Sequence, residues 1–169
     1  RTVLLAGMHD SGYIDALDIS NLDPANLNQP GFSFLWEQDG STNSDGTTTI
    51  DAPTDLPVIR MSREFAASPA QLFRAHTDAE LFVRWMGGEG STLEIDHWDA
   101  RTGGSWRYVG VSGSDEYAFR GCFHTVRPDR IVQTFTWEGM PDDVALETMT
   151  FEDLGEGRTR LHALSLCDS

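Results

Sequence analysis

Residues Arg63–Gly88, with the sequence REFAASPAQLFRAHTDAELFVRWMGG, predict a passage from a strand into two short helices. Ser68 precedes Pro69, a pair typical of a helix start, because serine caps the first-turn amides and proline is accepted at the first helical position. Gly87 and Gly88 are typical of a helix end. Between these signals the apolar residues recur at helical spacing: Leu72, Phe73, Ala75, Leu81, Phe82, Trp85 and Met86.

The residues on both sides of this segment predict strands. PVIRMSREF, which ends at Phe65, alternates in polarity as a half-buried strand does. Downstream, turn signals separate six further strand patterns, a cadence typical of an antiparallel meander. They cover residues 91–98, 105–111, 116–125, 130–138, 145–154 and 158–166.

One face of the predicted sheet is aromatic and has to be covered, because each large aromatic side chain buries on the order of 150–250 Å². The two short helices are too small to cover it. Residues 1–18 place apolar side chains at helical spacing, interrupted by Gly7 and Gly12. We therefore predict an α+β fold: a curved antiparallel sheet of about seven strands, two short helices, and one long helix across the concave face.

Four segments in combination resemble the START-like, helix-grip superfamily, and within it the family of the C-terminal domain of the activator of the heat-shock-ninety chaperone ATPase. They are Arg63–Gly88, Asp99–Tyr108, Gly121–Gly139 and Met149–Leu164. The resemblance extends over residues 57–166. It implies a helix-grip fold in the order strand, two short helices, six strands and a long C-terminal helix that grips the sheet.

The start of this chain resembles that family's last helix. Members often carry Gly-Met, Gly-Tyr and Leu-Asp pairs there, and this chain has Gly7-Met8, Gly12-Tyr13 and Leu17-Asp18. The resemblance suggests a circular permutation, natural or engineered. It would place the grip helix at 1–18, a linker with a strand at 31–38 over 19–56, and the START-like sheet and helix pair at 57–169. An unrelated N-terminal extension is the alternative.

Composition excludes several classes of partner. The formal net charge of −15 disfavours binding to nucleic acid and to anionic membrane surfaces. No apolar run approaches the roughly 18 residues of a membrane span, and the first residues lack a signal-peptide pattern. Cys122 and Cys167 predict neither a disulfide framework nor a zinc site. We expect a cytoplasmic protein that uses no cofactor.

The resemblance implies a cavity between the sheet and the long helix, and the aromatic residues are the candidate ligand contacts. A filled core is the alternative use of these side chains. Arg120, His124 and His162 are either polar contacts or outer-face residues. The candidate ligand-binding residues are Trp85, Trp106, Tyr108, Phe119, Phe123, Phe135, Trp137 and Met8.

Such a cavity favours binding of a hydrophobic small molecule or lipid, without catalysis. Family resemblance alone suggests a second function, a chaperone ATPase-activator-like module with a protein partner or a homodimer. A polyketide cyclase-like or hydrolase-like enzyme is the third. It would require an inward polar residue with a perturbed pKa, which the sequence patterns do not identify.

No catalytic or metal site is expected. Cys122 and His124 share one side of a strand, but a buried cysteine usually serves as a small apolar residue. The DHWD segment offers metal-ligand types, yet strand alternation places His97 and Asp99 on one face and Asp96 on the other. We interpret it as a surface cluster.

Overall fold

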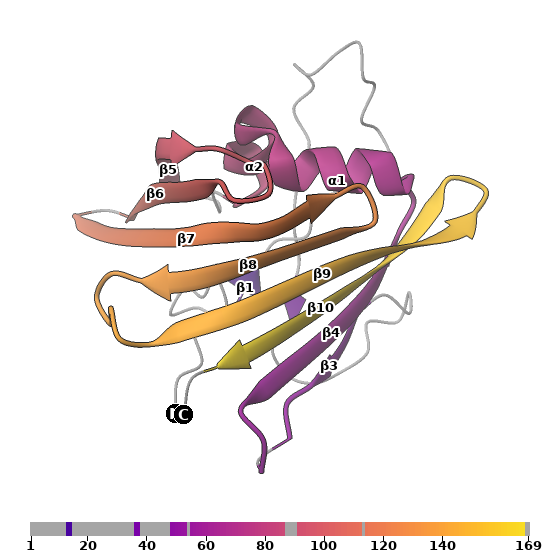
Figure 1. Cartoon of the computed structure of the whole chain (residues 1–169), viewed down its shortest axis with the longest axis horizontal. Coiled ribbons are helices and arrows are strands. Elements are labelled where there is room, and N and C mark those ends of the chain that lie inside the picture. The colour runs from indigo at the N-terminus through magenta and orange to yellow at the C-terminus, as the bar shows by residue number, and fades with distance from the viewer. Residues whose placement is uncertain are drawn as a thin grey trace.

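The protein is described by a computed structural model covering residues 13–14, 36–37, 48–53, 55–86, 91–112 and 114–167. Within these ranges the main body is an α+β fold, in which one antiparallel sheet curves around an aromatic core and carries two helices (Figure 1). The predicted fold class is confirmed.

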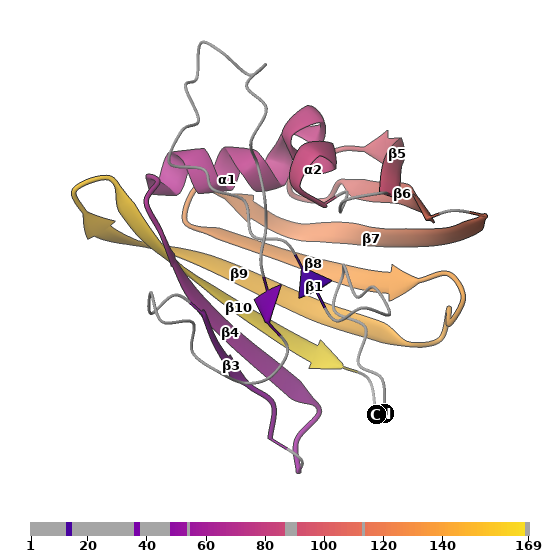
Figure 2. The ribbon, with the colours of Figure 1, turned by 180° about the vertical axis from the view of Figure 1, so that it is seen from behind.

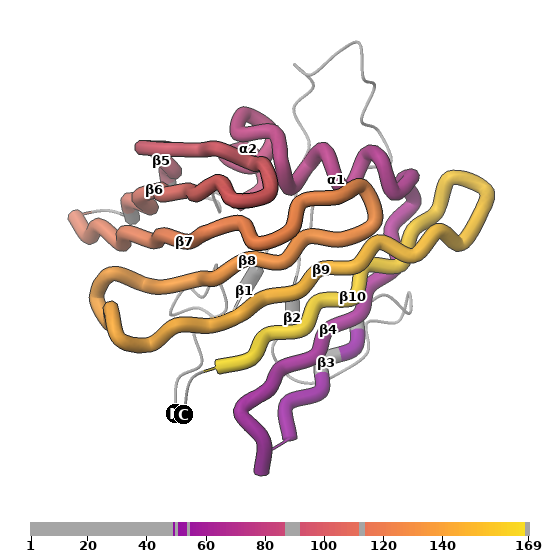
Figure 3. Tube along the Cα trace, viewed as in Figure 1, coloured from indigo at the N-terminus to yellow at the C-terminus, as the bar shows by residue number. Residues whose placement is uncertain are grey.

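The sheet has eight strands in the order β3-β4-β10-β9-β8-β7-β6-β5, one more than the sequence indicated. From β5 to β10 each strand pairs with the next in sequence, and Figure 3 follows the chain through this meander. Their bounds are β3 Thr48–Asp51, β4 Val58–Phe65, β5 Ser91–Trp98, β6 Ser105–Ser112, β7 Asp115–Arg127, β8 Arg130–Trp137, β9 Val144–Gly155 and β10 Arg158–Cys167.

The two helices form because each has its end groups satisfied. α1 (Pro69–Thr77) begins with a capping box, in which the Ser68 side chain and Gln71 each accept from the other's backbone N–H. Asp78 ends α1 and caps α2 (Ala79–Met86), since its Oδ1 accepts from the Leu81 amide at 3.3 Å. In Figures 1 and 2, α2 lies beside β5.

Indole hydrogen bonds attach the helices to each other and to the sheet. Trp85 Nε1 donates to the Ala75 carbonyl at 2.7 Å, which joins α2 to α1. Trp98 Nε1, at the end of β5, donates to the Thr77 carbonyl at 2.8 Å. Both carbonyls belong to the last turn of α1, where helix carbonyls lack helical partners. The two tryptophans therefore supply partners that the helix end requires.

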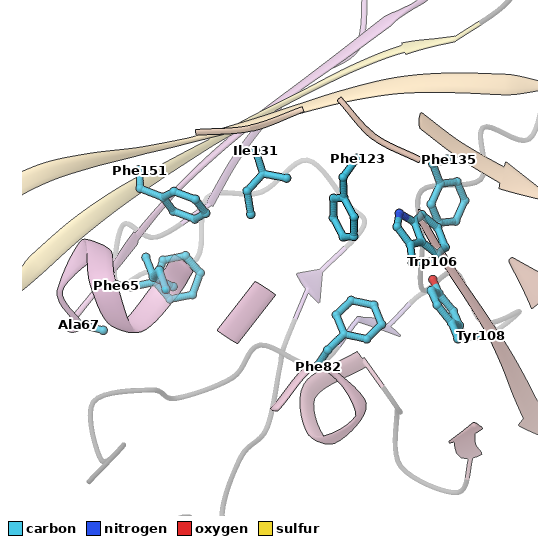
Figure 4. Packing of buried hydrophobic residues seen from close by; sticks show 10 residues of the cluster. Phe65, Ala67, Phe82, Trp106, Tyr108, Phe123, Ile131, Phe135 and Phe151 are labelled. Carbon is cyan, nitrogen blue, oxygen red and sulfur yellow. The ribbon is translucent and has the colours of Figure 1, made fainter. Parts of the chain in front are cut away.

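The core lies on the concave face of the sheet. Figure 4 shows the sheet bending around it, with Phe65 and Phe82 facing the side chains of the strands. Its fully buried members come from β4, the helix pair and the central strands. They are Phe65, Ala67, Leu72, Phe82, Trp106, Tyr108, Phe123, Ile131, Phe135 and Phe151.

The N-terminal predictions fall mostly outside the described residues. Of the long helix expected at 1–18, only Tyr13–Ile14 is described, and it is a short strand, β1, instead of a helix. β1 pairs with β2 (Trp36–Glu37), which falls within the strand expected at 31–38. The covering helix and the circular permutation stay predictions.

One strand lies where the sequence indicated linker. Thr48–Asp51 forms β3 and pairs with β4 in antiparallel register. Its sequence, TTID, is rich in β-branched residues, which favour a pleated surface. The surrounding Asn, Asp and Gly residues hid this short signal.

Gly121 on β7 permits a close approach that another residue would prevent. The six-membered ring of Trp106, directly opposite on β6, lies over it. A methyl group at Gly121 would come within 2.5 Å of Trp106 Cζ2, and closer still to the Thr134 carbonyl oxygen.

We expect Gly121→Ala to lower the free energy of unfolding by about 1–3 kcal/mol, because it overpacks the core against backbone. The matched control is Gly110→Ala on the neighbouring strand, where the nearest atom to the new methyl group would lie 3.9 Å away. That variant should change stability by less than about 1 kcal/mol. Urea unfolding measures both, and equal effects would contradict the packing described here.

Candidate binding site on the concave face

An aromatic wall covers the concave face of β6, β7 and β8. Trp106 stacks on Tyr108, with ring centroids 5.3 Å apart and planes 15° from parallel. Phe135 lies 5.6 Å from Trp106, and Phe119 bridges Tyr108 and Phe135 at 5.3 and 5.4 Å. Offset rings at these separations attract one another beyond their area burial. This wall is a rigid apolar surface.

Trp106 brings an unpaired donor into the wall. Its side chain is buried, and Nε1 has no hydrogen-bond partner among the described residues. In Figure 4 the indole nitrogen is turned toward Phe123, and the Tyr108 hydroxyl lies next to the Trp106 ring. A buried N–H without a partner costs about 1–3 kcal/mol. The Trp106 N–H is therefore an unsatisfied donor within the described residues.

A row of polar side chains crosses the concave face beside the wall. Gln133 on β8 pairs in register with Glu147 on β9, and Glu147 pairs with Ser165 on β10. Residues directly opposite each other on one face have Cβ atoms about 4.5–5.5 Å apart. Phe123, which pairs with Gln133 from β7, places this row on the core side of the sheet. We call Gln133, Glu147 and Ser165 the polar row.

Glu147 is the ionisable member of the polar row. Gln133 Nε2 donates to Glu147 Oε2 at 2.9 Å, while burial raises the pKa of the carboxyl above its ordinary value. The hydrogen bond opposes that rise but is the smaller influence. Apolar surroundings disfavour the charged form of a carboxyl group. Glu147 is thus an acid held on an apolar face.

Tyr108 and Glu147 share the same environment. Burial raises the pKa of Tyr108, and the charge of Glu147 raises it further. The phenol therefore stays neutral at physiological pH. Its hydroxyl is therefore a second polar group on this buried face that can donate a hydrogen.

The structure brings most of the sequence-predicted ligand contacts together. Trp106, Tyr108, Phe123 and Phe135 are buried in the core, and Trp85 and Phe119 pack against it half-buried. Trp137 is half-buried, and its ring lies over Gly139. Met8 lies outside the described residues.

The polar residues singled out in the sequence lie on the other face. Arg120, His124 and His162 are exposed, and so is Cys122. His162 Nε2 contacts Glu152 at 3.0 Å within an ion-pair group on β9 and β10. Of the two interpretations of Arg120, His124 and His162, the outer-face one is confirmed.

The polar row was missed from the sequence, although a signal for it exists. In ALETMTF, Ala145, Glu147, Met149 and Phe151 alternate with outward residues, so a charged residue stands on the apolar face. The aromatic residues were identified because they are large. Glu147 stands out only when this strand is read against its neighbours.

Two other features of the described residues bear on the site. No group of three or more His, Cys, Asp or Glu side chains gathers there as a metal site would require. Nor is any helix within the described ranges long and apolar enough to cross a membrane.

Comparison with known proteins identifies relatives of the sheet and helix pair. The family described as Activator of Hsp90 ATPase homolog 1-like protein matches residues 66–165. No curated protein was found to match the chain.

Solved structures share the fold. A protein from Chromobacterium violaceum is 26% identical, with a TM-score of 0.58 over 64% of this chain and 77% of its own. One from Mycobacterium smegmatis is 20% identical, with a TM-score of 0.65 over 73% and 80%. An Hsp90 activator from Plasmodium falciparum is 24% identical, with a TM-score of 0.51 over 64% and 71%.

The position of Glu147 predicts an unusual dependence of stability on pH. A raised folded-state pKa means that stability is full below the unfolded pKa and is lost as pH rises through the folded pKa. Glu147→Gln should therefore raise the melting temperature at about pH 7.5, and the gain should shrink toward about pH 4.

Glu152→Gln is the matched control on the outer face of the same strand. The pKa of Glu152 is lowered, first by its hydrogen bond with His162, so its contribution to stability is present at neutral pH and lost as pH falls. This variant should have a lower melting temperature at about pH 7.5, with the difference again shrinking in acid. Calorimetry of both variants should give opposite signs, and equal signs would contradict the inward position of Glu147.

Proposed function

Given that the chain belongs to the family of Activator of Hsp90 ATPase homolog 1-like proteins, we propose that it binds a hydrophobic small molecule or lipid on the concave face of its sheet. The observation that carries the proposal is that the aromatic wall lies beside polar groups that lack hydrogen-bond partners in the core. Ligand sites in proteins combine a mostly apolar surface with a few placed polar groups.

The partners of the three core indoles support this proposal. Trp85 and Trp98 donate to backbone carbonyls, whereas the Trp106 N–H has no partner among the described residues. A filled core would be expected to pair all three, since buried polar groups are nearly always hydrogen-bonded. The unpaired group therefore favours a binding surface over the filled-core alternative.

The position of Glu147 supports it as well. An acid placed on an apolar face costs stability unless it has a use. Ala163 on β10 and Met149 on β9 are register partners and flank the polar row on the same face. The acid would then orient a bound molecule.

Protein interaction is the second candidate. The family's description and the solved Hsp90 activator from Plasmodium falciparum favour it. It would use the outer face, where charged side chains of β4, β9 and β10 are exposed. The two candidates differ in the face of the sheet that they need.

The structure adds a candidate group for the third function, catalysis. Glu147, like Tyr108, is an inward residue with a perturbed pKa of the kind that an enzyme of this fold would require. Its described hydrogen bond is with Gln133, which is not a nucleophile. Binding is therefore the function that this arrangement supports best.

Binding is tested with Nile red, an uncharged apolar dye whose fluorescence rises in apolar surroundings. The natural chain should bind it, and Ala163→Phe, which fills the concave face, should weaken binding at least about tenfold. Leu166→Phe is the matched control, because Leu166 is exposed on the outer face of the same strand.

The outcome separates the candidates. Equal dye binding by both variants, or none by the natural chain, would refute binding at the concave face. The ATPase turnover of purified Hsp90 should be unchanged by the chain. Stimulation that Ala163→Phe retains would instead support the outer-face interaction.

A further inference from the structure

The concave face presents a buried hydrogen-bond donor that has no partner among the described residues. Trp106 is 3% exposed, and its buried indole N–H has no partner among the described residues. The Tyr108 hydroxyl belongs to a ring that stacks against Trp106. Donors that are buried and unpaired favour a partner with an acceptor oxygen.

The two groups lie on the same face of the sheet as the polar row. Trp106 pairs in register with Gly121, and its ring reaches over β7 to contact Phe135 on β8. Figure 4 shows the indole nitrogen turned toward Phe123, and Phe123 is the register partner of Gln133. Gln133 in turn donates to Glu147, so Phe123 and Gln133 lead across the concave face from the Trp106 indole to the Glu147 carboxyl.

Glu147 adds a third hydrogen-bonding group to those of Trp106 and Tyr108. Gln133 donates to Oε2 of its carboxyl, which leaves Oε1 without a described partner. Burial favours the protonated carboxyl, and in that form the free oxygen carries a hydrogen that can be donated. The surface then offers three donors of different kinds: an indole N–H, a phenol O–H and a carboxyl O–H.

We propose that the ligand's polar group is an uncharged carbonyl oxygen, received by the Trp106 N–H and the Glu147 carboxyl, with the hydrocarbon part lying against the aromatic wall. This inference rests on the proposed function and names the chemistry of the ligand. A carbonyl oxygen has two lone pairs and no hydrogen, so it can satisfy two donors at once.

A hydrophobic ammonium ion is the competing ligand chemistry. Aromatic faces beside a carboxylate attract cations. An ammonium group, however, has donors and no acceptor, so it would leave the Trp106 N–H unpaired and would require Glu147 to ionise on an apolar face. The arrangement of donors thus favours the carbonyl.

Three ligands of equal length distinguish these possibilities: methyl nonyl ketone, undecane and undecylamine, each displacing Nile red from the full chain. The natural chain should bind the ketone about tenfold tighter than the alkane, a difference of about one hydrogen bond. Glu147→Gln keeps a donor and should keep that preference within about threefold. Glu147→Met removes it and should abolish the preference.

A second pair of variants tests the indole. Trp106→Phe should also reduce the ketone preference, whereas Trp98→Phe should not, because the Trp98 N–H donates to the Thr77 carbonyl. The infrared carbonyl stretch of the bound ketone provides a direct readout of hydrogen bonding. It should lie lower in the natural chain and in Trp98→Phe than in Trp106→Phe and Glu147→Met, and near-UV circular dichroism checks that each variant is folded.

The binding results distinguish the carbonyl site from a cation site and from the absence of a binding site. Equal binding of ketone and alkane by the natural chain would overturn the carbonyl site while leaving the proposed function intact. Tightest binding of the amine, lost in both Glu147 variants, would replace it with a cation site. Binding of none of the three ligands, nor of the dye, would refute the proposed function itself.

Discussion

The contact of Trp106 with Gly121 is the constraint on which the concave face depends. A glycine opposite the tryptophan allows the indole to lie over β7 instead of standing between strands, and so to reach Phe135 on β8. Tyr108 then stacks on the same ring. A larger residue at Gly121 would push the Trp106 ring away from β7 and separate the rings of the aromatic wall. Cores of native density have little room to adjust to such a change.

The contact of Trp106 with Gly121 also sets the orientation of the indole N–H. With its ring held over Gly121, Trp106 cannot turn its N–H toward a helix carbonyl as Trp85 and Trp98 do. The donor stays unpaired at the border of the polar row. The fold thus loses stability to an unsatisfied N–H and to an acid on an apolar face. Local violations of packing rules of this kind are expected at functional sites.

The sequence predicted the architecture well because its signals are local. The six strand patterns after residue 90 each overlap one observed strand, since alternation and turn residues specify a strand without knowledge of its partners. Ser68 caps α1 as predicted, because a capping box lies within four residues. The short β3 was missed, since a four-residue edge strand depends on β4 for its formation.

The sequence by itself determined the order of strands and helices and the aromatic character of one face, because both follow from periodicities of two and of 3.6 residues. Only the tertiary structure decided which side chains meet. Glu147, Gln133 and Ser165 come from three strands separated by turns, and their alignment depends on inter-strand register, which one residue of slippage would invert. Likewise, three tryptophans that look alike in sequence differ in their hydrogen bonding, because only packing determines which indole finds a carbonyl.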